Sequence, residues 1–194
     1  YFGIIDLAGF PKDVYWFYQS EWTDKDVLHI FPHWNWNPGQ AVDVWAFTNC
    51  DEVELFLNGN SLGRQSKSRD DFNLVWKVQF EEGTLLGVGY RNGSEVMRSE
   101  IRTAGEPATL QLSPDRAEIK ADGSDLSFIT VTVADKDGNT LPHAANMINF
   151  SVEGPGTIAG VDNGSQTSME PFKADYRKAY NGKCLVVVRA GKEK

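Results

Sequence analysis

The chain of 194 residues has only two cysteines, Cys50 and Cys184, and they lie far apart. They form no Cys-x-x-Cys pair and no cluster with histidine, so the number of ligands excludes a structural zinc site. We expect two buried free thiols, and the alternative is a disulfide between them. So few cysteines do not indicate a redox compartment. The sequence predicts no metal site and no cofactor.

Long apolar runs and an excess of basic residues are also missing. The hydrophobic stretches span only a few residues, so we expect no transmembrane helix and no membrane insertion. Acidic residues outnumber Lys and Arg by 27 to 19, which gives a net charge of −8. This balance disfavours nucleic acids and anionic membranes as partners, because both are bound by clustered Lys and Arg. The hydrophobic content of 41% indicates an ordinary folded protein.

Short strands separated by turns follow from about residue 25. Asn58-Gly59 and Asn92-Gly93 each supply two residues that tolerate positive φ, which is typical of a type I′ hairpin. The number of strands is that of an immunoglobulin-like β-sandwich. The expected strands are residues 27–31, 41–48, 52–57, 61–65, 73–80, 84–90 and 95–102.

A second series of strands follows a linker at residues 105–107. Residues 135–139 are rich in Asp and Asn, and we interpret them as a turn because the ligand spacing of a calcium loop is missing. The expected strands are residues 109–112, 117–120, 128–134, 148–152, 156–160 and 183–190. The fold class is therefore all-β, with two consecutive immunoglobulin-like β-sandwiches at residues 25–104 and 105–194. The second is expected to be truncated at its last strand.

Helical patterning is confined to the start of the chain. Residues 2–6 are typical of a short buried strand or loop, and Pro11 and Asp13 suit the first turn of a helix. A helix that is apolar on most sides normally lies between two layers. We therefore predict that its aromatic side chains are largely buried, against the first sandwich or across a homodimer interface. They are Tyr15, Trp16, Phe17, Tyr18 and Trp22.

No catalytic arrangement stands out. The adjacent acids at residues 51–52, 70–71 and 81–82 fit solvated turns, and no pair suggests the two carboxyl groups of a glycosidase. The three histidines, His29, His33 and His143, are accompanied by no Gly-x-Ser-x-Gly elbow. We expect no catalytic residue in this chain.

The most unusual cluster is the loop at residues 31–39, with His33, Trp34, Asn35 and Trp36 at its centre. Tryptophan faces pack well on the C–H bonds of a pyranose ring, and Asn supplies hydrogen bonds, so these four residues are candidate carbohydrate contacts. The other interpretation, which we favour, is that they pack between the helix and the first sandwich. An oligosaccharide or polysaccharide is the corresponding candidate ligand.

Three segments carry a resemblance to a known family. Residues 1–13, which include Gly-Phe-Pro-Lys-Asp, resemble the last strand and helix of the catalytic (β/α)8 barrel of glycoside hydrolase family 2. Residues 33–36 and 48–59 resemble the sandwich that follows the barrel in β-galactosidases of this family, notably those of Bacteroides-type bacteria. Residues 119–123 and 154–164 resemble the next, bacterial immunoglobulin-like domain.

The resemblance implies a retaining β-galactosidase whose two catalytic glutamates, one of them in an Asn-Glu pair, lie in the barrel upstream of residue 1. The present sequence contains no Asn-Glu dipeptide, so no catalytic residue carries over. Residues 1–24 would then be a remnant of the barrel, and the rest a non-catalytic accessory region whose partner is the upstream barrel of the same polypeptide. The implied location is the periplasm, the extracellular space or the cell surface. The alternatives are a carbohydrate-binding module that uses Trp34 and Trp36, and an adhesin-like structural module.

Overall fold

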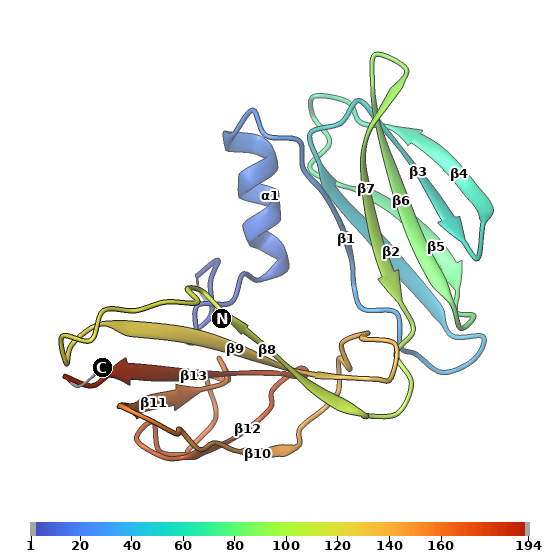
Figure 1. Cartoon of the computed structure of the whole chain (residues 1–194). Coiled ribbons are helices and arrows are strands. Elements are labelled where there is room, and N and C mark those ends of the chain that lie inside the picture. Colours follow the sequence, from blue (N-terminus) through green and yellow to red (C-terminus); the bar gives the residue numbers. More distant parts are fainter. Residues whose placement is uncertain (1–2, 193–194) are drawn as a thin grey trace. The chain divides into compact units, whose positions relative to one another are not determined.

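The computed structural model describes residues 3–192, which divide into two compact units (Figure 1). The first unit contains residues 3–4 and 11–103, and the second contains residues 5–10 and 104–192. The sequence predicts residues 1–24 as one segment, whereas the structure groups residues 5–10 with the second unit. Of the residues described, none belongs to a helix long and apolar enough to cross a bilayer.

The helix α1 (Asp13–Trp22) begins at Asp13, in the first turn of the helix, where a carboxylate is favourable against the helix dipole. It ends at Thr23, whose backbone is extended and whose hydroxyl donates to the carbonyl of Gln19 at 2.8 Å. No strand precedes α1 among residues 3–12, so of the two alternatives for residues 2–6 the described part is a loop. Its residues are exposed or half-buried, so the predicted burial is wrong, and Phe2 lies outside the described residues. A barrel strand needs neighbouring strands for its hydrogen bonds, and the described part of the chain pairs no strand with residues 3–12.

The first unit is a sandwich of two antiparallel sheets, which confirms the predicted fold class. One sheet has the strand order β1-β2-β5 and the other β4-β3-β6-β7. The strands are β1 (Leu28–Phe31), β2 (Ala41–Thr48), β3 (Glu52–Leu57), β4 (Asn60–Ser66), β5 (Leu74–Gln79), β6 (Thr84–Arg91) and β7 (Ser94–Arg102).

Alternation of side chains along the strands builds the core of this unit. In β2 the buried and exposed positions alternate almost without exception, and β3 and β5 repeat the pattern. Successive side chains of a strand point to opposite faces, so every second residue enters the space between the sheets. The inward-facing residues of these strands include Val44, Val53, Leu55 and Trp76, all of which are buried.

Two predicted Asn-Gly turns have the backbone that the sequence requires. Asn58 and Asn92 have φ of 51°, and the glycines that follow have φ of 81° and 78°. Two consecutive positive φ values are those of a type I′ turn, so both hairpin predictions are confirmed. A third such turn, Asn181-Gly182, joins β12 (Tyr176–Lys178) to β13 (Lys183–Ala190), and it was not predicted from the sequence.

The second unit contains a four-stranded sheet, in the order β11-β13-β9-β8, and a two-stranded sheet of β10 and β12. Its core includes Val131, Val133, Ile148, Val161 and Val186. The strands are β8 (Thr109–Pro114), β9 (Leu126–Ala134), β10 (Met147–Asn149), β11 (Gly156–Asp162), β12 (Tyr176–Lys178) and β13 (Lys183–Ala190).

Two strand predictions in this unit are wrong. Residues 117–120 form no strand, because the carboxylate of Asp125 accepts the Lys120 N–H at 2.9 Å and the Asp122 carboxylate accepts the N–H groups of Ser124 and Asp125. These local bonds hold the segment in turns. Strand β12, in contrast, lies between the expected strands 156–160 and 183–190, where the sequence predicts no strand.

Candidate functional site

The predicted sugar-contact loop lies in the first unit, and its tryptophans have different environments. Trp34 is fully buried, its indole N–H donates to the carbonyl of Glu81 at 3.0 Å, and its ring meets Phe80 edge-on at 5.2 Å between centroids. A ring with no exposed surface offers no face to a pyranose. The prediction that Trp34 stacks on a sugar is therefore wrong, and Trp34 is a core residue.

Trp36 lies against the edge of the core and stacks on the His33 ring, with centroids 4.5 Å apart and planes 19° from parallel. Its indole N–H donates to the His33 carbonyl at 2.8 Å, and the Asn35 N–H donates to His33 Nδ1 at 3.3 Å. These contacts hold the loop in one shape and cover one face of each ring. All three residues are half-buried, and their role as sugar contacts stays a prediction.

Helix α1 packs on the outer face of the sheet β1-β2-β5, through aromatic contacts. Trp16 stacks on His29 of β1 with centroids 5.3 Å apart, and Phe17 packs on Phe47 of β2 at 5.5 Å. The His29 Nε2 and the Asp13 carboxylate form a hydrogen bond of 2.8 Å. The side-chain contacts of α1 therefore agree with its assignment to the first unit.

Burial of the aromatic side chains of α1 against the first sandwich holds only in part, and burial across a homodimer interface stays a prediction. Tyr15, Trp16, Phe17 and Tyr18 are half-buried, whereas 76% of Trp22 is exposed. The helix is aromatic on several sides, but a single sheet can cover only one of them. The exposed area continues onto the sandwich at Phe72, which packs edge-on against Phe17 and is 68% exposed.

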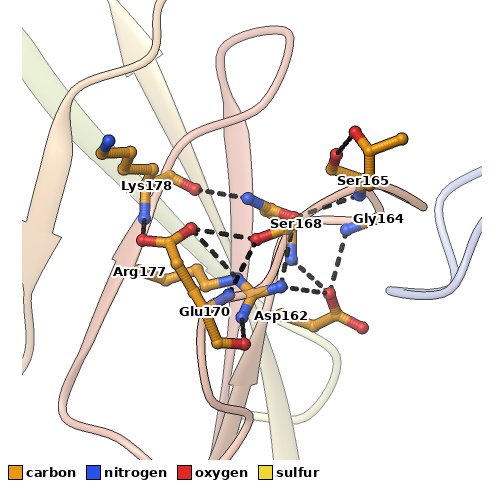
Figure 2. A network of polar contacts seen from close by, with 9 residues as sticks. Asp162, Gly164, Ser165, Ser168, Glu170, Arg177 and Lys178 are labelled. Carbon is orange, nitrogen blue, oxygen red and sulfur yellow. Dashed lines mark hydrogen bonds and ion pairs between the residues drawn. The ribbon is translucent and has the colours of Figure 1, made fainter.

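The second unit holds a buried ion cluster around Arg177 of β12 (Figure 2). Only 1% of Arg177 is exposed, and its Nη2 lies 3.2 Å from an oxygen of Asp162 and 3.3 Å from Oδ1 of Asn163. Its Nη1 donates to the Glu170 carbonyl at 2.9 Å, and its Nε lies 3.9 Å from the Glu170 carboxylate. A buried charge of this kind persists only with partners. The cluster therefore fixes two points of the segment between β11 and β12, its beginning at Asp162 and Asn163 and its middle at Glu170.

We call residues 162–175, which connect these strands, the connecting loop. Its outer side carries two large apolar side chains, Met169 and Phe172, which are 95% and 58% exposed. One face of the Phe172 ring is covered by the Arg177 guanidinium, whose Cζ lies 5.3 Å from the ring centroid. The loop therefore combines a fixed base with an apolar outer surface. The sequence pattern predicts no role for this loop.

An open pocket of about 460 Å³ lies beside the end of the connecting loop. It is lined by Thr157, Ile158, Ala159, Lys173, Ala174, Asp175 and Arg189. Two cationic side chains and one carboxylate give it a polar lining, and its size would suit a small polar ligand.

The two cysteines are free and buried, as predicted. Burial raises the pKa of the Cys50 thiol, and it raises the pKa of the Cys184 thiol to about 12. The thiolate is the nucleophilic form of cysteine, so neither residue is suited to covalent catalysis near neutral pH.

The predicted turn at residues 135–139 is confirmed. The buried Asp135 carboxylate accepts backbone N–H groups from Gly105, Asp137 and Asn139, at 2.9 Å each. These hydrogen bonds, led by that of Gly105, hold the pKa of the carboxyl well below its usual range. The carboxylate therefore stabilises a turn. Within residues 3–192 no group of three or more His, Cys, Asp or Glu side chains is placed to hold a metal ion.

The fold and these clusters define a pair of β-sandwich modules, one of which carries an aromatic helix. The chain belongs to glycoside hydrolase family 2 through its C-terminal domains. Residues 110–194 match glycoside hydrolase family 2 C-terminal domain 5, and residues 39–97 match a domain of unknown function, DUF4982.

The proteins that are similar to this chain are named as glycosidases. Beta-galactosidase BoGH2A of Bacteroides ovatus is 57% identical over 190 residues, which are 97% of this chain and 22% of that protein. A crystal structure of a β-glycosidase from Bacteroides vulgatus matches with a TM-score of 0.96 and 37% identity, over 100% of this chain and 25% of that one. A β-glucuronidase of glycoside hydrolase family 2 matches with a TM-score of 0.86 and 27% identity, over 98% of this chain and 20% of that one. The chain spans 20–25% of the length of these proteins.

Proposed function

We propose that this chain is the non-catalytic C-terminal accessory region of a β-galactosidase of glycoside hydrolase family 2, and that it supports the catalytic barrel. The observation that carries the proposal is the 57% identity to a protein named β-galactosidase, over 97% of this chain but only 22% of the relative. A β-galactoside is preferred to a β-glucuronide as substrate because that relative shares more identity than the matched β-glucuronidases, such as those at 36% and 27%.

The carboxylates of the two units support a non-catalytic role. Retaining glycosidases need two carboxyl groups facing one glycosidic bond across about 5–5.5 Å. The buried carboxylate of Asp135 is already engaged by backbone N–H groups, and the partly buried carboxylates of Asp162 and Glu170 are engaged by Arg177. The sequence also lacks the Asn-Glu pair that the family resemblance implies for the acid/base.

The surface of α1 supports a scaffolding role. The first sandwich covers one side of the helix through Phe47 and His29, and Trp22 on the helix remains 76% exposed. Contiguous apolar surface of this kind usually marks an interface. We assign it to the barrel of the same polypeptide, because the family resemblance makes α1 the last barrel helix. A second copy of the chain on this surface would be the competing arrangement.

Two deletions in the full-length polypeptide test the support that we propose. Ending the polypeptide at residue 24 removes the sheet that covers α1, and we expect a large loss of soluble, active enzyme and a lower thermal midpoint. Ending it at residue 104 keeps that sheet and serves as the matched control, with a smaller expected loss. Equal activity and an equal thermal midpoint for the intact polypeptide and the shorter deletion product would contradict a supporting role.

A further inference from the structure

The segment before α1 forms a small closed loop, residues 5–10, that is part of the second unit. The Asp6 N–H donates to the Phe10 carbonyl at 3.0 Å, and the Asp6 carboxylate accepts the Phe10 N–H at 2.8 Å. Ala8 within it is buried, whereas Leu7 is 63% exposed. The loop therefore has a defined shape and one side that faces away from the unit.

The connecting loop of the second unit lies directly against this closed loop. A Cβ placed on Gly164 would lie 2.1 Å from an oxygen of Asp6, so the Asp6 carboxylate occupies the space that a side chain at residue 164 would need. Gly164 also has a φ of +75°, which favours glycine. The N-terminal segment, in pale blue, passes beside the labelled Gly164 in Figure 2. Lys183 of β13 adds a second contact, with its Nζ 6.0 Å from the centroid of the Phe10 ring.

The order of elements fixes the side of a barrel on which such a closed loop would lie. It precedes α1, and in the proposed function α1 is the last helix of the (β/α)8 barrel. The closed loop then connects the last strand to the last helix. Loops of this kind lie at the carboxyl ends of the barrel strands, which is the face that carries the active site. The connecting loop, which contacts it, must reach the same face.

The connecting loop also has the properties of a preformed binding surface. Arg177 holds Asp162 and Asn163 at its start and Glu170 near its tip, so little conformational entropy remains to be lost on binding. Met169 and Phe172 project from this fixed base with 95% and 58% of their surface exposed. Aromatic rings and other apolar groups pack on the C–H faces of sugars.

We propose that the connecting loop forms part of the wall of the active-site entrance, and that Met169 and Phe172 contact the leaving-group side of an oligosaccharide substrate. This inference rests on the proposed function. The terminal sugar must reach the catalytic groups at the centre of the barrel face, so the rest of an oligosaccharide extends outward past the surrounding loops. The second sandwich thereby sets the preference for oligosaccharides over small aryl glycosides.

The test uses the full-length polypeptide with Met169→Ser and Phe172→Ser combined. Met169 is almost fully exposed and Phe172 is 58% exposed, so the second unit is expected to fold, and a thermal midpoint measured for the double variant checks the loss of the contact between Phe172 and Arg177. The substrates are a p-nitrophenyl β-glycoside and a trisaccharide with the same terminal sugar, as β-galactosides and as β-glucuronides. We expect kcat/KM for the trisaccharide to fall about fivefold to tenfold, the scale of one aromatic contact, mainly through KM. The value for the aryl glycoside should stay within about twofold of the original.

Two further variants, each compared with the double variant or with a control, test whether the loss is specific to the connecting loop and whether it depends on the packing of that loop against residues 5–10. Leu112→Ser removes an apolar side chain that is 60% exposed on β8, away from the connecting loop in sequence, and should change neither substrate. Gly164→Ala forces a methyl group onto Asp6 and should reproduce the loss for the trisaccharide. Its control, Gly154→Ala, has a similar φ of +89° with no atom within 4 Å of the added Cβ. Trisaccharide turnover should therefore fall only for the first of these glycine variants.

The possible failures are distinguishable. If the unaltered full-length polypeptide hydrolyses neither of the two β-galactosides, the proposed function fails, and this inference, which rests on it, fails with it. If it hydrolyses an aryl glycoside and the matching trisaccharide, and the double variant keeps its trisaccharide activity or loses both activities equally, the inference alone is overturned.

Discussion

Replacement of Arg177 by methionine is expected to destabilise the second unit by about 3 kcal/mol, because removing one partner of a buried ion pair leaves the other charges uncompensated. Asp162 and Glu170 would each lose the buried cation with which they pair. Their side chains keep 14% and 21% of their surface in solvent, so some hydration would return and the loss should lie at the low end of the usual range. Methionine has a similar length, which limits the cavity left behind.

The two buried thiols allow this loss to be assigned to one unit. Cys184 lies in the second unit and Cys50 in the first, and both react with a thiol reagent only when their unit opens. A loss of 3 kcal/mol should raise the labelling rate of Cys184 by about a hundredfold, with Cys50 unchanged. Mass spectrometry of the labelled peptides distinguishes the two sites.

The matched control for this prediction is Arg116→Met. Arg116 also lies in the second unit and pairs with Asp125 at 3.0 Å, but its side chain is 47% exposed. An exposed ion pair of this kind contributes about 1 kcal/mol or less. Equal labelling rates for the Arg177 and Arg116 variants would show that the buried cluster does not hold the connecting loop.

Replacement of Trp34 by alanine should have an equally large effect in the first unit, a destabilisation of about 3–5 kcal/mol. Trp34 is fully buried against Phe80, and its loss would leave a large cavity and an unpaired carbonyl at Glu81. The control is Trp22→Ala, which removes an indole that is 76% exposed and should cost about 0.5 kcal/mol.

Urea unfolding followed by tryptophan fluorescence measures this effect cleanly. All six tryptophans lie in the first unit, so the signal reports that unit alone. We expect a much lower urea midpoint for Trp34→Ala and almost none of that shift for Trp22→Ala. Similar midpoints for both variants would contradict the assignment of Trp34 to the core and would restore it as a candidate sugar contact.

Local chemistry made much of the fold predictable. The alternation along β2 and β3 gave their bounds, and the Asn-Gly pairs gave two hairpins, because both signals depend only on residues close in sequence. The strand predicted at residues 117–120 is wrong because an alternating apolar-polar pattern contains no information on Asp125. The carboxylate of Asp125 accepts the N–H of Lys120, five residues earlier, and so holds this segment in a turn.

The environments of individual side chains were harder to predict. Trp34 and Trp36 lie two residues apart in a loop without periodicity, so nothing in the sequence distinguishes the buried ring from the half-buried one. The exposure of Trp22 in the single chain could not be predicted, because a helix with aromatic residues on several sides does not reveal which side the sheet covers. The Arg177 cluster depends on partners up to 15 residues away, and only the alternation around Arg177 in β12 hinted that its side chain points inward.

The central claim is that the chain contributes support and no bond-breaking chemistry. The most direct measurement compares hydrolysis of p-nitrophenyl β-galactoside by the purified chain of 194 residues and by the full-length polypeptide, both produced in a host that lacks β-galactosidase. We predict release of nitrophenol by the full-length polypeptide and a rate equal to that of buffer for the chain alone. Turnover that co-purifies with the isolated chain would contradict the account.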